Sequence, residues 1–145
     1  MQLKKLIQNY NKNILPVFFL GIFSFSITYY YGFMGLMPSD NTVLYNGGYK
    51  VLNGYIPFND YWLVTGPLLD YINAFFFLFF GTTWKSYIFH SSFVNLILAI
   101  SSFYLFKSLM LSSLYAVLYA CLISILFYPV VGTPFVDHHS TFFLI

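Results

Sequence analysis

The chain has 145 residues, of which 59% are hydrophobic and only 7% are charged, with no glutamate and no arginine. So few charged groups cannot cover a water-facing surface, which excludes an ordinary soluble domain and predicts an all-α integral membrane protein. The formal net charge of +2 is too small to indicate nucleic acid as a partner.

The first predicted element is a transmembrane helix over residues 14–37. A helix needs about 20 apolar residues to cross a hydrocarbon layer about 30 Å thick, and this segment provides them. The preceding residues 1–13 carry Lys4, Lys5 and Lys12. Because positive charge stays on the cytoplasmic side, we expect a cytoplasmic N-terminus and a first helix that runs outward. The apolar run is too long for a secretory signal, and no small-residue cleavage site follows it.

Residues 38–84 form the predicted first outer loop, in which short juxtamembrane helices are expected over about 41–52 and 67–80. Asp40, Asp60 and Asp70 all lie in this loop. The second short helix reaches roughly 21 Å at 1.5 Å per residue, which is too short for a crossing. A competing interpretation extends it back to Tyr61 as a membrane span. That version places Asp70 near the bilayer centre at a cost of about 2.5 kcal/mol or more, so the short helix is preferred.

Two further spans are predicted over 85–107 and 111–131, separated by a turn that carries Lys107. If this turn is cytoplasmic, residues 132–140 form a second outer loop on the same side as the first. Residues 141–145 then begin another crossing. The prediction is therefore about three complete transmembrane helices and the start of a fourth. Because the sequence stops within an apolar run, it is expected to be a fragment of a longer protein that is inactive alone.

The order of motifs in the first outer loop is distinctive. Asp40 is followed by YKVLNGYIPFNDYW, then by GPLLDYINAFFFLFFG, and then by WKSYIFHSS. This order resembles the N-terminal part of the GT-C superfamily of membrane glycosyltransferases, which includes protein mannosyltransferases, aminoarabinose transferases and undecaprenyl-linked bacterial relatives. The residues that match their first-loop pattern are Gly54, Pro57, Phe58, Asp60, Gly66, Pro67 and Leu68.

The resemblance implies transfer of a sugar from a polyprenyl-phosphate-linked donor to a glycan, lipid or protein acceptor. The reaction takes place on the outer face of the membrane, here expected to be a bacterial plasma membrane. By the same resemblance, Asp40 and Asp137 are the catalytic carboxylates of the two outer loops. A carboxylate in this position can accept the proton of the attacking hydroxyl.

Other residues are assigned roles around these two acids. Lys85 and Lys50 are candidates to hold the donor phosphate as it leaves. The residues expected to line the site are His138, Asp60 and Tyr61. A divalent cation held by Asp40 and Asp137 is left open as a cofactor. The tripeptide Asp137-His138-His139 alone is a poor metal site, because adjacent histidines point in different directions.

Several of these residues also have a structural interpretation. Asp40 stands where a helix N-cap is expected, and Asp60 can organise a turn. Lys85 can anchor a helix end by snorkelling, and Asp70 complements a helix dipole. His90, within the second predicted span, is expected to form a hydrogen bond to a neighbouring helix. The alternative function is a non-catalytic membrane module, a subunit or scaffold that binds lipid or partner helices.

Overall fold

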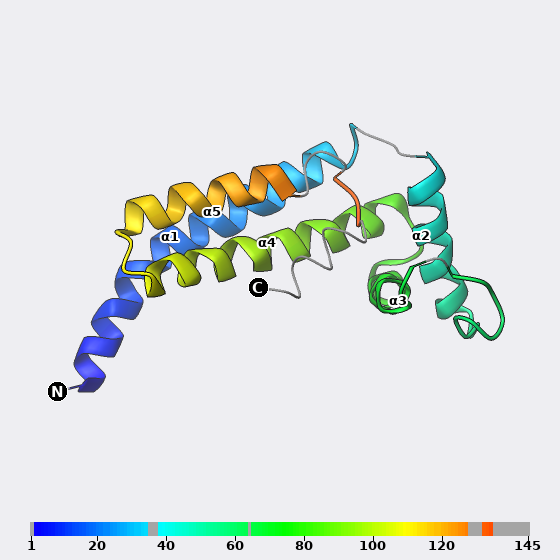
Figure 1. Ribbon diagram of the computed structural model, residues 1–145, viewed down its shortest axis with the longest axis horizontal. Helices are drawn as coiled ribbons and strands as arrows, with labels where there is room; N and C mark the ends of the chain where they lie inside the picture. Colours follow the sequence, from blue (N-terminus) through cyan, green and yellow to red (C-terminus); the bar gives the residue numbers. More distant parts are fainter. Residues whose placement is uncertain (1, 35–37, 64, 128–131, 135–145) are drawn as a thin grey trace.

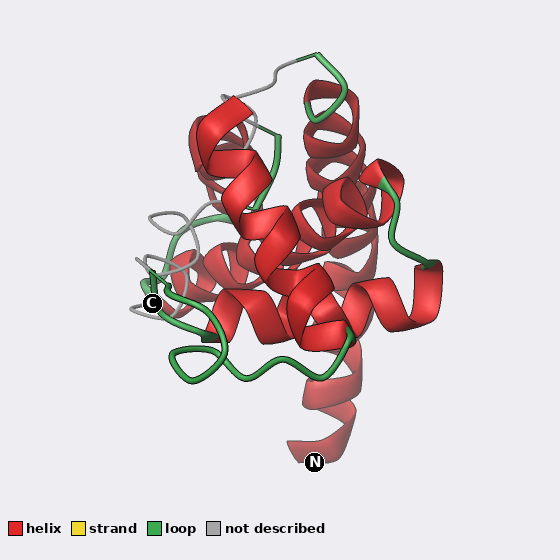
Figure 2. Ribbon diagram, turned by 90° about the vertical axis from the view of Figure 1, so that its right-hand side faces the viewer, coloured by secondary structure: helices red, strands yellow, loops and turns green. Residues whose placement is uncertain are grey.

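The computed structural model describes residues 2–34, 38–63, 65–127 and 132–134. Over these ranges the chain forms the helices α1 (Gln2–Tyr31), α2 (Pro38–Leu52), α3 (Leu68–Phe80), α4 (Trp84–Ser108) and α5 (Ser113–Phe127). Helices joined by loops make up the whole described part of the chain (Figure 2). The predicted all-α class is therefore confirmed.

The helices form two groups. Helices α1, α4 and α5 pack side by side along the long axis of the molecule, and α2 and α3 lie at one end of this bundle (Figure 1). Figure 1 shows α3 nearly end-on, so its axis runs across the bundle instead of along it. Helix α3 packs on both α2 and the bundle helix α4. The polar first loop is thus folded as a cap on the bundle.

The number of membrane spans differs from the prediction. Within the described residues, two helices are long and apolar enough to cross a membrane: Asn13–Tyr31 with 19 residues and α4 with 25. The prediction of about three complete spans and the start of a fourth is wrong. Helix α5 has 15 residues and reaches about 22 Å, short of a hydrocarbon layer about 30 Å thick. Residues 141–145 lie outside the described part of the chain.

The first helix also differs from the predicted range 14–37. It begins at Gln2, so the lysine-bearing N-terminal segment continues the helix instead of preceding it. It ends at Tyr31, where the backbone N–H groups of Phe33 and Met34 bond to carbonyls three residues back. Gly32 follows, and a Cβ there would lie 2.6 Å from the carbonyl oxygen of Gly132. The close approach of these two segments therefore requires glycine at this position.

A buried asparagine joins the three bundle helices. The side-chain amide of Asn95 in α4 donates to Thr28 Oγ1 at 2.7 Å and to the Ser24 carbonyl oxygen at 3.3 Å, both in α1. It also donates to the carbonyl oxygen of Ser124 in α5 at 3.1 Å. Interhelical hydrogen bonds of this kind hold helices together where apolar surface alone gives no preference over lipid.

The contact of α2 with α3 depends on small residues in α2. Gly47 and Gly48 are both buried against α3, and a Cβ at Gly48 would lie 2.5 Å from Asn73 Cβ. At this crossing Asn73 donates to the Leu44 carbonyl oxygen at 3.2 Å and pairs with His90 Nδ1 in α4. His90 therefore forms the interhelical hydrogen bond expected of it.

Candidate functional site

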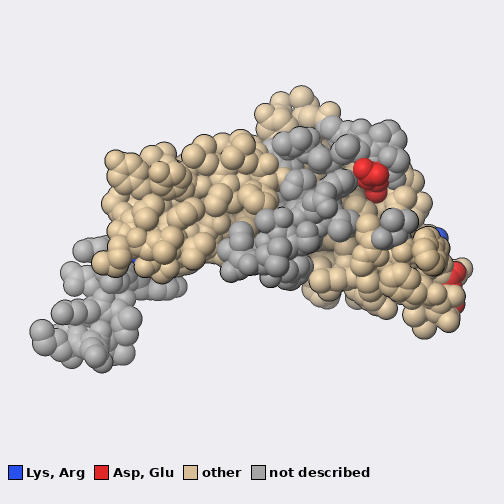
Figure 3. Space-filling model, in the orientation of Figure 1, with Lys and Arg blue, Asp and Glu red and all other residues tan. Residues whose placement is uncertain are grey.

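The predicted site residues are divided between the two ends of α2. Asp40 is in the first turn of this helix and Lys50 is in the last turn, so they are about 15 Å apart along the helix axis. Because α2 begins at Pro38, Asp40 lies inside the helix and not at its N-cap. An acid in the first turn is still favoured by the helix dipole, by about 0.3–1 kcal/mol. On the face shown in Figure 3, acidic atoms appear at two separate places at the α2 end of the molecule.

The first turn of α2 borders a pocket of about 200 Å³, lined by Asn41, Thr42, Tyr45 and Trp84. Trp84 is the first residue of α4, and its indole N–H donates to the Gly32 carbonyl oxygen at 3.2 Å. In the chain, Asp40 directly precedes the lining residue Asn41. The exposed Lys85 directly follows the lining residue Trp84. The structure thus brings the helix turns that carry Asp40 and Lys85 to the same pocket.

The described part of the second outer loop meets this same end of α2. Thr133 donates to the side-chain oxygen of buried Asn41 at 2.8 Å. The backbone of this segment is fixed by Ser91, which donates to the Gly132 carbonyl oxygen at 2.8 Å, and by Tyr87, which donates to that of Pro134 at 3.3 Å. Asp137 and His138 lie outside the described residues.

The last turn of α2 carries a different cluster, centred on Tyr61. The Lys50 ammonium lies 4.6 Å from the centre of the Tyr61 ring, within the range of a cation–π contact. The Tyr61 hydroxyl donates to Asp70 Oδ2 at 2.7 Å. Asp70 is fully buried, and its Oδ1 accepts no hydrogen bond from the described residues. Sequence reasoning named Lys50 and Tyr61 as site residues but missed Asp70, because helix-dipole complementarity alone accounted for an acid in the first turn of α3.

Burial determines the ionisation of this cluster. It raises the pKa of the Asp70 carboxyl, and the Tyr61 hydrogen bond and the charge of Lys50 oppose this increase. Burial, together with the hydrogen bond to Asp70, raises the pKa of the Tyr61 hydroxyl.

The Asp60 side chain forms hydrogen bonds within the turn in which it lies. Its two carboxylate oxygens accept from the Ile56 backbone N–H at 2.7 Å and from the Asn59 side chain at 2.8 Å. These bonds close a tight loop in which Phe58 has a positive φ of 66°. The residue lies in an exposed loop and lines neither of the two pockets along α2. Its contacts are those of the turn-organising role.

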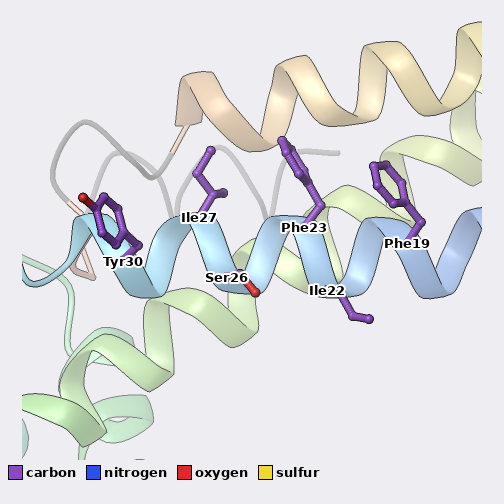
Figure 4. Close-up of a pocket in the computed structure, with 6 residues that line it drawn as sticks. All are labelled: Phe19, Ile22, Phe23, Ser26, Ile27 and Tyr30. Atoms are coloured by element: carbon purple, nitrogen blue, oxygen red, sulfur yellow. The ribbon is translucent and has the colours of Figure 1, made fainter.

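Two other features bear on binding. Among the described residues, no group of three His, Cys, Asp or Glu side chains could hold a metal ion. An apolar pocket of about 440 Å³ lies on α1 and is lined by Phe19, Ile22, Phe23, Ser26, Ile27 and Tyr30. Figure 4 shows these side chains along one helix, with hydroxyl groups only on Ser26 and Tyr30. This pocket suits an apolar occupant and offers no catalytic group.

The pKa of Asp70 leads to a stability prediction. An unfolded aspartate titrates near pH 4, and the folded carboxyl keeps its proton to a higher pH. Between these two pKa values the folded state binds more protons, so stability falls as the pH rises, by at most about 1.4 kcal/mol per pH unit. Asp70→Asn is expected to remove this slope and to be more stable than the parent at pH 7. Thermal unfolding in detergent from pH 3.5 to 8 measures both curves.

Tyr61→Phe provides a second test of the same pair. It removes a hydrogen bond that lowers the pKa of Asp70, so the pH range over which stability falls should extend further upward. If the curves of stability against pH were parallel for the parent and Asp70→Asn, the raised pKa of Asp70 would be contradicted.

No protein-family model matches the chain, and searches of curated proteins and of solved structures likewise found no match. The function therefore has to be inferred from the residues themselves and from their positions in the fold.

Proposed function

We propose that this chain is the N-terminal portion of an integral-membrane glycosyltransferase. The enzyme transfers a sugar from a polyprenyl-phosphate-linked donor to a glycan, lipid or protein acceptor outside the membrane. The proposal is supported chiefly by the hydrogen bond from Thr133 to Asn41. This bond joins the helix turn that carries Asp40 to the segment that precedes Asp137 in the sequence. The proposed reaction requires the two acid-bearing loops to meet at one site.

Asp40 and Lys85 have distinct roles in the proposed reaction. The acceptor oxygen attacks the anomeric carbon, and its proton passes to the Asp40 carboxylate. The bond between that carbon and the phosphate oxygen breaks, and its electrons leave with the lipid phosphate. Lys85 supports the charge that develops on this phosphate. Asn41 also lines the pocket, and its Nδ2 has no hydrogen-bond partner among the described residues, so it is a donor suited to a bound ligand.

The membrane arrangement follows from the lysines. Figure 1 shows the turn between α4 and α5 at the same end of the bundle as the N-terminal half of α1. Lys107 precedes this turn and donates to the Leu111 carbonyl oxygen and to Ser113, both at 3.2 Å. Positive residues are retained in the cytoplasm, so this end is proposed to be cytoplasmic and the α2–α3 cap external. The chain is then a multi-pass protein of a bacterial plasma membrane.

A non-catalytic membrane module is the second candidate. The apolar pocket on α1 favours it, because a groove lined mainly by Phe and Ile side chains suits a lipid chain or a partner helix. In this case donor and acceptor sugars are not substrates, and Asp40 only stabilises the start of α2.

The test uses the chain in lipid nanodiscs with undecaprenyl-phosphate-linked hexoses and pentoses that carry a radiolabel. Trp62 and Trp84 are the only tryptophans, so a Trp62→Phe background isolates the emission of Trp84 beside the proposed site. We expect the donor to quench Trp84 emission of the chain in this background. Because the chain is expected to be inactive alone, release of labelled sugar to an acceptor or to water is expected from the longer protein of which it is proposed to be the N-terminal portion, with Trp62 unchanged. Absence of quenching by the chain, together with absence of donor consumption by the longer protein, would overturn the proposal and favour the non-catalytic module.

A further inference from the structure

A second pocket lies along the opposite end of α2, between that helix and the segment that leads to α3. Its volume is about 200 Å³. One wall is formed by Val43, Asn46, Gly47 and Lys50, which share one face of α2 because they are three or four residues apart. The facing wall is formed by Tyr61 and Trp62. The pocket is thus built by a rigid helix face and an aromatic pair.

The two walls present different chemistry. Trp62 is 84% exposed, so its large apolar ring surface is available beside the pocket. Asn46 on the opposite wall is exposed and offers both a hydrogen-bond donor and an acceptor. The Lys50 ammonium adds further donors. A ligand that fits both walls has one apolar face and several hydroxyl groups around its edge.

The charges around the pocket balance. Gly47 forms part of the wall, and a Cβ at this position would lie 2.2 Å from Asp70 Oδ1, so the Asp70 carboxyl is directly behind it. Above its raised pKa, the Asp70 carboxylate carries a charge opposite to that of Lys50, and both groups contact Tyr61. A ligand with a net charge of either sign therefore gains attraction from one group and repulsion from the other. The pocket favours a polar but uncharged ligand.

We propose that this pocket binds one neutral pyranose ring of a glycan. The C–H face of the sugar stacks on Trp62, and its hydroxyl groups bond to Asn46 and Lys50. The assignment of a sugar to the pocket depends on the pocket alone. Its role as part of the acceptor rests on the proposed transferase function.

The binding test titrates the full chain in nanodiscs with methyl glucopyranoside, methyl galactopyranoside and methyl mannopyranoside, followed by saturation-transfer NMR. Glucuronic acid and glucosamine are the charged comparisons. We expect at least one neutral sugar to bind with a Kd in the millimolar range and the charged sugars to bind at least fivefold more weakly. Absence of binding by all three neutral sugars would overturn the proposal. So would equal or tighter binding of a charged sugar.

Substitutions in and beside the pocket test whether the sugar binds there. Trp62→Ala is expected to weaken sugar binding at least tenfold, whereas Tyr55→Ala is expected to change it less than twofold. Tyr55 is a matched control because it is 52% exposed in the same loop but does not line the pocket. Should Trp62→Ala fail to fold, the test is made with Asn46→Ala, a change on the exposed surface of α2 that is expected to weaken binding about fivefold. Unchanged affinity in the folded variant would contradict the proposed site.

The two proposals fail in different ways. Sugar binding that depends on Trp62, without donor quenching or consumption, would retain the sugar pocket and remove the transferase. Donor-dependent transfer without any binding of neutral sugars at Trp62 would retain the transferase and remove the sugar pocket.

Discussion

Replacing Asp40 by asparagine is expected to reduce sugar transfer by about 10²–10⁴-fold, the usual contribution of a positioned general acid or base. Asparagine has nearly the same shape and keeps a side-chain oxygen that can accept a hydrogen bond, but it cannot accept the proton of the attacking hydroxyl. The structural role of Asp40 includes a favourable interaction with the dipole of α2, about 0.3–1 kcal/mol. The two roles therefore predict very different rates.

The measurement is the initial rate of donor-dependent transfer in nanodiscs by the longer protein of which this chain is the proposed N-terminal portion, as the parent and as Asp40→Asn. Asp40→Glu retains a carboxylate and should keep more activity than Asp40→Asn. Ser108→Ala serves as the control, since Ser108 is an exposed residue at the far end of α4, and its rate should stay within twofold of the parent. Equal rates for Asp40→Asn and the parent, with only a small loss of stability, would leave Asp40 as a structural residue.

Local sequence signals were sufficient for the approximate positions of the short helices. Helices were predicted over about 41–52 and 67–80, and the structure has α2 over Pro38–Leu52 and α3 over Leu68–Phe80. Gly66-Pro67 marks the start of α3, and Gly81, with a positive φ of 78°, follows its end. These signals act over a few residues, so they can be recognised without the rest of the fold.

The span count and the division of the site depend on tertiary structure and could not be predicted in the same way. Within the described residues α5 extends over Ser113–Phe127, a range shorter than a membrane span requires. Asp70 appeared to be a simple dipole partner, yet the packing of α2 on α3 buries it completely behind Gly47. Lys85 was predicted as a phosphate ligand, with Lys50 as a second candidate. Lys50 lines the pocket at the last turn of α2, whereas Lys85 follows Trp84, which lines the pocket at the first turn of that helix.

Gly47-Gly48 shows the same dependence on packing, and it leads to the second large prediction. In sequence, two glycines weaken a helix, since each costs about 0.8–1 kcal/mol relative to alanine. A Cβ at Gly48, however, would lie 2.5 Å from Asn73 Cβ, 3.1 Å from Phe77 Cε2 and 3.3 Å from the Ala74 backbone nitrogen. Asn73 cannot move away without losing its bonds to Leu44 and His90. The glycine is therefore required for α2 to approach α3.

We expect Gly48→Ala to destabilise the protein by about 2–3 kcal/mol, because the cost of overpacking exceeds the gain in helix propensity. This corresponds to a decrease in Tm of about 5–10 °C, measured by circular dichroism in detergent. Gly21→Ala is the matched control, since Gly21 is also helical and the nearest atom to its added Cβ would be Leu96 Cδ1 at 3.8 Å. That variant should be as stable as the parent or up to about 1 kcal/mol more stable. If both variants changed stability equally, close packing of α2 on α3 would not be the reason for glycine at position 48.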